Sequence, residues 1–366
     1  MKPETAAYAR KAGLLLLLAA LPLAVFAQTA SFGFVNYDDV KTLVDSALTT
    51  GLTRQNVAAI FTHYTFDVFY PVTTLSYAVD RELWGLSPGA FHAVNLFLHL
   101  ANVLLVFLLA RTAVREAGAK ESSFAAGLFA GALFAVHPAA AQPVAWLPGR
   151  EELLMLFFAL AALHLHIRAL KGGPASAALH LLASAAAFLA ALSQVAMAFL
   201  PVGAALYQVL IAGRRRAGRI LVSTSGLWAA AGTAVFLRVL SWLTYSEDTS
   251  ALLYPHLPTA LANLPAILGS VGQGGGSGLF HKLALLVPKW LFTVQDGLFP
   301  WFFRALDVPD KHLLFDPLRV VSGVLALGGL AALGYFFRRD RAFLFGLLWF
   351  VLALFPAAAL AKGPLP

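Results

Sequence analysis

Long apolar runs separated by short basic loops constrain this chain more than any other feature. About 20 apolar residues suffice for a helix to cross the hydrocarbon core of a bilayer. Arginines gather between the runs, as in "GRRRAGR" (213–219) and "RRDR" (338–341), which is typical of cytoplasmic loops. We therefore predict an all-α integral membrane protein, a multi-spanning bundle of about 8–11 helices. Candidate spans lie near 89–110, 122–141, 151–168, 175–193, 196–212, 219–243, 318–337 and 342–361.

The composition agrees with a membrane protein and excludes several other classes. Hydrophobic residues make up 60% of the chain and charged residues 12%, and the mean hydropathy is +0.76. Soluble domains average about 45–50% apolar and 25% charged residues. The net charge of +8 resides in the loops that flank spans, so it does not indicate nucleic acid as a partner. The chain has no cysteine, which excludes disulfides and thiolate chemistry.

The N-terminal segment has two interpretations. Lys2, Arg10 and Lys11 precede "AGLLLLLAALPLAVFA", which suits either a cleaved signal peptide or a retained first helix. We favour a retained helix over 12–35. With either interpretation the basic N-terminus is cytoplasmic, and the segment that follows lies outside the cytoplasm.

The remaining organisation follows from the order of the spans. We predict a single transmembrane domain over 1–366. The glycine run "GQGGGSG" (272–278) lacks the Lys-Ser/Thr of a phosphate-binding loop, so we interpret it as a flexible loop. The predicted parts are the first helix (12–35), a large first external loop (36–88), helices two to seven (89–243), an external or re-entrant region (244–317) and the last two helices (318–361).

Two adjacent carboxylates, Asp38 and Asp39, follow the first apolar segment in "FVNYDDV". A carboxylate at the membrane surface can act as a general base toward a hydroxyl group. The alternative is structural, since aspartate is also a preferred residue at the start of a helix. Further charges of the same loop are Asp67, Asp80, Arg81 and Glu82.

A polar stripe and a charged cluster are the other candidate sites. His92, Asn95, His99 and Asn102 recur at spacings of three and four, so they share one face of a helix. They suit either a functional site or hydrogen bonding between helices.

The charged cluster lies in the next external loop and consists of His137, Arg150, Glu151 and Glu152. Arg150 suits a phosphate group, because guanidinium pairs with phosphate through two hydrogen bonds. The alternative is an interfacial anchor whose charged end reaches the membrane surface.

Four stretches resemble a known family: "FVNYDDV", residues 70–106 ("YPVTTLSY…"), residues 132–154 ("ALFAVHPAAAQPVAWLPGREELL") and "LSQVAMAFLP" (192–201). The chain resembles the GT-C class of membrane glycosyltransferases, and within it most resembles bacterial relatives of the transmembrane O-mannosyltransferases that carry tetratricopeptide repeats. The resemblance implies a mannosyltransferase-like hexosyltransferase. Such an enzyme moves a sugar from a polyprenyl-phosphate carrier to an acceptor hydroxyl of a protein, lipid or glycan. It also implies the bacterial inner (plasma) membrane, with the site facing the periplasm or exterior.

The resemblance also implies roles for the candidate residues. One of Asp38 and Asp39 would be the catalytic base, and the pair would hold a divalent metal (Mg²⁺ or Mn²⁺) if one is used; no other cofactor is implied. The carrier phosphate and substrate would meet His137, Arg150, Glu152, His92, Asn95 and His99.

Departures from the family pattern support alternatives. Gln142 stands where the family has glutamate, and Gln194 and Val195 stand where it has a Lys-Glu pair. Arg150-Glu151-Glu152 replaces Arg-x-Asp, and the printed sequence contains no tetratricopeptide repeats. A catalytically degenerate relative that serves as a membrane scaffold or partner subunit is therefore the alternative. A transporter of lipid-linked sugars is a third possibility, although the two halves show no inverted repeat.

Overall fold

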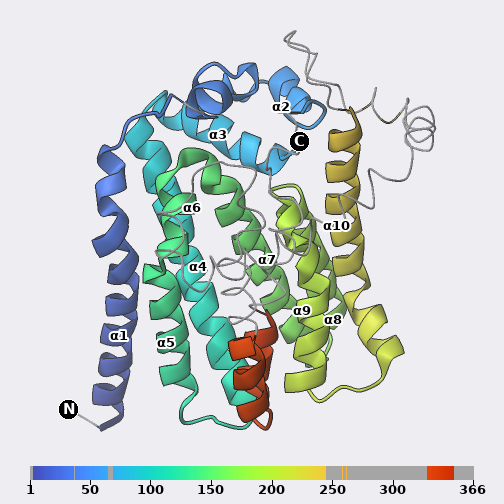
Figure 1. Ribbon diagram of the computed structural model, residues 1–366. Coiled ribbons are helices and arrows are strands. Elements are labelled where there is room, and N and C mark those ends of the chain that lie inside the picture. The colour runs from blue at the N-terminus through green and yellow to red at the C-terminus, as the bar shows by residue number, and fades with distance from the viewer. Residues whose placement is uncertain are drawn as a thin grey trace. The chain divides into compact units, whose positions relative to one another are not determined.

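The computed structural model describes residues 3–36, 38–64, 69–244 and 328–349, with the isolated residues 258 and 261 (Figure 1). These residues form helices and no β-strand. Four helices are long and apolar enough to cross a membrane, or five if the bent pair Ser123–Val136 and Pro138–Ala145 counts as one span. This confirms the all-α membrane fold. The four are Glu4–Ser31, Pro88–Glu116, Leu147–Ala169 and Ala217–Arg238.

The chain divides into two compact units, Met1–Gln194 and Val195–Pro366, which we describe separately. The single domain over 1–366 stays a prediction. The predicted external or re-entrant region, 244–317, lies almost entirely outside the described residues.

Unit 1 contains the first loop, which we predict to be external, and the spans that surround it. Short 3₁₀-helices lie at Ala27–Ser31, Ala47–Thr49, Pro138–Ala140 and Leu147–Gly149, and a π-helical turn lies at Val40–Val44. In Figure 1 α2 and α3 lie at the end of the unit opposite the N-terminus. The α-helices of the unit are α1 (Pro3–Phe26), α2 (Arg54–Ile60), α3 (Pro71–Trp84), α4 (Pro88–Glu116), α5 (Ser123–Val136), α6 (Ala141–Ala145), α7 (Arg150–Ala169) and α8 (Ser176–Ala191).

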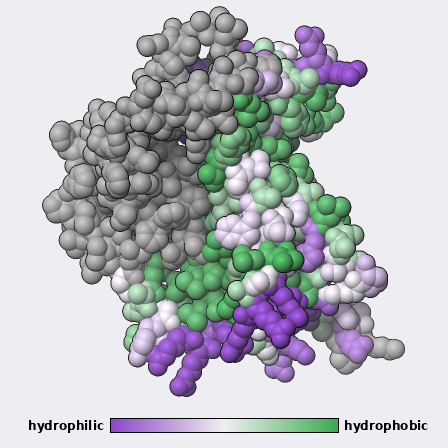
Figure 2. All heavy atoms as spheres, turned by 90° about the vertical axis from the view of Figure 1, so that its right-hand side faces the viewer, coloured by the Kyte–Doolittle hydropathy of each residue, from purple (hydrophilic) through white to green (hydrophobic). Residues whose placement is uncertain are grey.

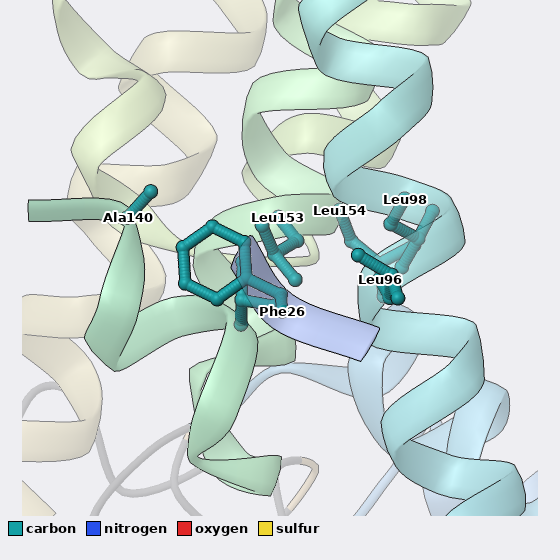
Figure 3. Packing of buried hydrophobic residues seen from close by; sticks show 7 residues of the cluster. Phe26, Leu96, Leu98, Ala140, Leu153 and Leu154 are labelled. Atoms are coloured by element: carbon teal, nitrogen blue, oxygen red, sulfur yellow. The ribbon is translucent and has the colours of Figure 1, made fainter. Parts of the chain in front are cut away.

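Two hydrophobic clusters hold the spans of unit 1 together. Figure 3 shows the first, in which Phe26 at the end of α1 packs with residues of α4, the Pro138–Ala140 turn and α7. In the second, Leu18 of α1 packs with Val103 and Phe107 of α4. The approach of α4 to α5 depends on a glycine, because a Cβ atom on Gly127 would lie 2.8 Å from the Phe107 carbonyl oxygen. Small residues allow such close helix packing in membranes.

Prolines and one glycine set the turn that precedes α7. α5 ends at Val136, His137 caps it, and Pro138 begins the next helical turn. A Cβ atom on Gly149 would lie 2.6 Å from the Pro143 Cα atom, so only glycine fits where this loop folds back on itself. The fold-back places Arg150 at the first position of α7.

Unit 2 begins with α9 (Leu200–Leu206), which is flanked by helical turns at Val195–Phe199 and Tyr207–Ile211, and continues with α10 (Ala217–Thr244). Gln208 and Ser223 form a hydrogen bond between these elements, with 3.0 Å between Gln208 Nε2 and Ser223 Oγ. Residues 328–336 and 341–349 are also helical and fall within the last two predicted spans. In Figure 2 many hydrophobic residues lie in the middle of the coloured surface, and hydrophilic side chains gather at its lower edge and at its upper right, as expected of helices that cross a membrane.

Candidate active site in the first loop of unit 1

The two adjacent carboxylates of the first loop have different surroundings. Asp38 is half-buried, whereas Asp39 is only 1% exposed. Asp39 Oδ2 accepts a hydrogen bond from the Val35 backbone N–H at 2.8 Å. Asp39 Oδ1 is buried and has no hydrogen-bond partner among the described residues. Because the side chain makes no capping bond to the turn that follows, the helix-start interpretation does not account for Asp39.

Burial changes the acid–base behaviour of Asp39. Loss of water around the carboxylate raises the pKa of Asp39 above the ordinary aspartate value. The Val35 N–H opposes this rise, and the neighbouring Asp38 charge adds to it. Burial therefore disfavours the charged form of Asp39.

Arg150 is the centre of a buried network that joins three helices. Its side chain is fully buried and forms an ion pair with Asp80 of α3. Its Nε atom donates to Asn95 Oδ1 of α4 at 2.7 Å, and its Nη2 atom donates to the Phe91 carbonyl oxygen at 2.9 Å. The guanidinium also lies 4.7 Å from the ring centroid of Tyr77. Arg150 thus holds α3 against the starts of α4 and α7.

These contacts bear on the predicted role of Arg150 as a phosphate ligand. In this structure its three nitrogens donate to protein groups, and its side chain does not reach the surface. Phosphate binding by Arg150 stays a prediction that requires a rearrangement. The sequence analysis did not identify Asp80 as the partner of Arg150. The available signal was an aspartate in a segment, 71–84, that also contains several apolar residues. A carboxylate that is buried in such a segment needs a cation beside it.

Tyr77 connects this network to the acid pair. Its hydroxyl donates to the Leu147 carbonyl oxygen at 2.9 Å. Burial raises the pKa of Tyr77, and the charges of Arg150, Glu151, Asp39 and Asp80 all act on it. The Tyr77 hydroxyl is therefore neutral, and the charges of Asp39 and Asp80 both act on it.

The polar stripe on α4 is largely engaged by backbone carbonyl groups. Asn95 Nδ2 donates to Trp146 O at 3.4 Å, His99 Nε2 lies 3.1 Å from Ala135 O, and Asn102 Nδ2 donates to Leu153 O at 3.0 Å. This pattern favours the hydrogen-bonding interpretation of these three residues. Substrate binding by Asn95 and His99 stays a prediction.

His92, the first residue of the stripe, differs from the other three members. It is 2% exposed, and among the described residues neither ring nitrogen makes a close hydrogen bond, although the Gly33 backbone interacts with the ring. Its ring packs edge-on against Phe32, with 5.8 Å between the ring centroids. Its predicted contact with substrate stays open.

The remaining predicted residues lie around the start of α7. His137 is half-buried, and its Nδ1 atom accepts a hydrogen bond from the Ala139 N–H at 3.2 Å, which closes the turn after α5. Glu151 and Glu152 are half-buried in the first turn of α7. Roles for His137 and Glu152 at a carrier phosphate stay predictions.

The described residues do not form a ready metal centre. No three His, Cys, Asp or Glu side chains among them converge closely enough to hold an ion. Asp38 and Asp39 alone supply fewer ligands than Mg²⁺ or Mn²⁺ requires. We therefore derive no step through a metal.

Comparison with known proteins reveals similarity to one group of curated proteins. The chain is 29% identical over 164 residues to protein O-mannosyl-transferase F38B6.6 of Caenorhabditis elegans, which covers 42% of this chain and 23% of that protein. It is 34% identical over 142 residues to protein O-mannosyl-transferase Tmtc1 of Drosophila melanogaster, covering 37% of this chain and 16% of that protein. For TMTC2 of Mus musculus the identity is 33% over 157 residues, with coverages of 40% and 18%.

These matches support a relationship and limit its extent. The chain spans less than a quarter of the length of these relatives. No family model matches the chain, and no solved structure is significantly similar to it. The chain is therefore related to the protein O-mannosyl-transferases of the TMTC group over part of its length, and these relatives are animal proteins.

Proposed function

We propose that this chain is a membrane glycosyltransferase that transfers a sugar from a polyprenyl-phosphate carrier to an acceptor hydroxyl at the external face of the membrane. The observation that carries the proposal is the acid pair, in which a half-buried Asp38 lies beside a buried Asp39, one of whose oxygens has no hydrogen-bond partner among the described residues. Similarity to protein O-mannosyl-transferases supports the reaction class. A mannosyl donor and a protein acceptor are the corresponding proposals for the substrates.

We assign the base to Asp38. A base must come within hydrogen-bond reach of the acceptor hydroxyl, and Asp38 is the more accessible of the two carboxylates. Burial raises the pKa of Asp39 and so disfavours its charged form, which makes Asp39 the less suitable base of the two.

The reaction then follows from the residues of the chain. The Asp38 carboxylate takes the proton of the acceptor hydroxyl as its oxygen bonds to the anomeric carbon. The bond between that carbon and the phosphate oxygen breaks, and the lipid phosphate leaves with the bonding electrons. Proton transfer of this kind contributes about 10²–10⁴-fold to the rate. His137 and Glu152 remain our candidates near the leaving phosphate, because both are partly accessible.

The test is sugar transfer in purified membranes from a radiolabelled mixture of polyprenyl-phosphate sugars. We expect Asp38→Asn to lower the rate about 100-fold or more. Asp39→Asn should have a smaller effect, because Asp39 is buried and an asparagine oxygen can still accept the Val35 N–H. The reverse order would move the base to Asp39. Transfer that survives both changes would remove the acid pair from the chemistry, and a wild type that binds carriers without transfer would favour the scaffold alternative.

A further inference from the structure

We infer that Asp80, Arg150 and Arg81 position the acid pair, and that Arg150 acts from within the protein instead of contacting the carrier phosphate. This inference rests on the proposed function. In it the three residues affect kcat and leave the affinity for the sugar donor unchanged. The contacts run from the spans to α3, and from α3 to the turn that carries Asp38 and Asp39.

The first step is the attachment of α3 to the spans. At its N-terminus the Val72 N–H donates to Leu192 O at 3.2 Å, and Thr73 Oγ1 donates to Ser193 O at 3.2 Å. Near its C-terminus Asp80 is 4% exposed and pairs with the fully buried Arg150. Both ends of the helix are therefore fixed to the ends of α7 and α8.

The second step is the attachment of the acid-bearing turn to α3. Arg81 Nη1 donates to Leu43 O at 3.0 Å and to Val44 O at 3.1 Å. The same nitrogen donates to Thr49 Oγ1 at 3.2 Å, which closes the loop after the turn. Carbonyl groups at the end of a helical turn lack partners within it, and Arg81 supplies one.

The third step is the hydrophobic packing beneath the turn. Leu43 is completely buried in a cluster with Tyr77, Phe91 and Leu147, and Phe34 packs against this cluster. Each of the three cluster partners also belongs to the Arg150 network. Arg150 lies over the rings of Tyr77 and Phe91, the Phe91 carbonyl accepts its Nη2, and Leu147 O accepts the Tyr77 hydroxyl.

The hydrophobic cluster and Arg81 hold the chain on either side of the acid pair, the cluster before Asp38 and Arg81 after Asp39. Phe34 packs edge-on against Phe91, with 6.1 Å between ring centroids, and the next residue donates its N–H to Asp39. Arg81 holds the carbonyls that follow Asp39. A shift of α3 would therefore move Asp38 and Asp39, although none of the three positioning residues hydrogen-bonds to them in the described structure.

The alternative, in which Arg150 binds phosphate, predicts a different kinetic change. If Asp80 only neutralised a phosphate ligand, Asp80→Asn would leave the KM for the donor unchanged or lower it, because Arg150 would carry more free charge. In the positioning role, Asp80→Asn lowers kcat and leaves the donor KM unchanged. A misplacement of about 1 Å can cost 10²-fold in rate.

The experiment uses Arg81→Gln as the main variant, because Arg81 is only half-buried and its loss leaves the Asp80–Arg150 pair intact. Arg81→Lys is the conservative variant, and Arg54→Gln is the control, since Arg54 is exposed on α2 of the same loop. Two readouts are taken in full-length protein in membranes or detergent. One is hydrogen–deuterium exchange of peptides that cover residues 38–49, and the other is kcat and donor KM.

We expect Arg81→Gln to speed exchange over 38–49 and to lower kcat about 10-fold or more at constant KM. Arg81→Lys should recover part of both, and Arg54→Gln should change neither. Unchanged exchange in Arg81→Gln, or a higher donor KM at constant kcat, would overturn the inference. If the wild type transfers no sugar, the proposed function fails, whereas the exchange result still decides whether these residues hold the turn.

Discussion

Asp39 and Asp80 are two aspartates of the first loop that are buried almost equally but have different surroundings. Asp80 is 4% exposed and pairs with a buried arginine. Asp39 is 1% exposed, and one of its oxygens has no partner among the described residues. Burial raises the pKa of both, but only at Asp80 does Arg150 oppose the rise. A buried carboxylate with a counter-ion thus supports the structure, whereas one without a counter-ion marks a site with another purpose.

The largest expected effect is on stability at Asp80. Asp80→Ala leaves the Arg150 charge buried without its partner, and breaking such a pair costs about 3–5 kcal/mol of the free energy of unfolding. We expect a much lower melting temperature in detergent and a reduced yield of monodisperse protein. A melting temperature equal to that of the wild type would show that the pair does not support the fold.

A smaller change of opposite sign is expected at Asp39. Asp39→Asn replaces a buried carboxyl group whose charged form burial disfavours, and its side-chain oxygen can still accept the Val35 N–H. Single stabilising substitutions commonly gain about 0.5–2 kcal/mol. We expect a melting temperature equal to or above that of the wild type, with lower transferase activity. A loss of stability as large as that of Asp80→Ala would erase the contrast between the two aspartates.

The pH dependence of stability sharpens the same contrast. The pKa of Asp39 is raised in the folded state, so its contribution to stability is fully present below the unfolded pKa, near 3.8, and is lost as the pH rises through the folded value. Melting curves from pH 4 upward should therefore show the wild type losing stability relative to Asp39→Asn. Parallel curves for the two proteins would contradict the raised pKa.

Tyr77 tests the link between the two regions. Tyr77→Phe removes the hydrogen bond to Leu147 O and keeps the ring beneath Arg150. Loss of one buried hydrogen bond costs about 0.5–1.5 kcal/mol. We expect a moderate fall in melting temperature, with faster hydrogen exchange in residues 38–49. An unchanged exchange rate there would indicate that the ring alone transmits the support.

The smallest effect is expected at an ion pair near the other ends of α4 and α7. Lys171 Nζ lies 2.9 Å from Glu116 Oε1, and the lysine side chain is 51% exposed. Exposed pairs contribute about 0–1 kcal/mol. Lys171→Gln should leave the melting temperature and transfer rate nearly unchanged, and it serves as the matched control for Asp80→Ala. A loss comparable to that of the buried pair would show that burial is not what distinguishes them.

The sequence by itself determined the membrane fold and the place of the candidate site. Hydropathy and loop charge are local properties, so the sequence alone can predict where spans lie. The predicted span 89–110 lies within α4, and the predicted span 151–168 lies within α7. The pair "DD" after the first apolar segment identified the acid turn for the same reason, because both its chemistry and its position outside a span are local properties.

Only the tertiary structure decided which charged residues belong together. Arg150 and Asp80 are 70 positions apart, and Arg150 and Asn95 are 55 apart, so no local pattern joins them. The sequence also presented Asp38 and Asp39 as equals, and His99 and Asn102 as a possible site. Burial separates the first two, and neighbouring carbonyl groups engage the second two. Because burial and pairing arise when distant segments pack, the chemistry of a charged side chain is fixed by the fold that surrounds it.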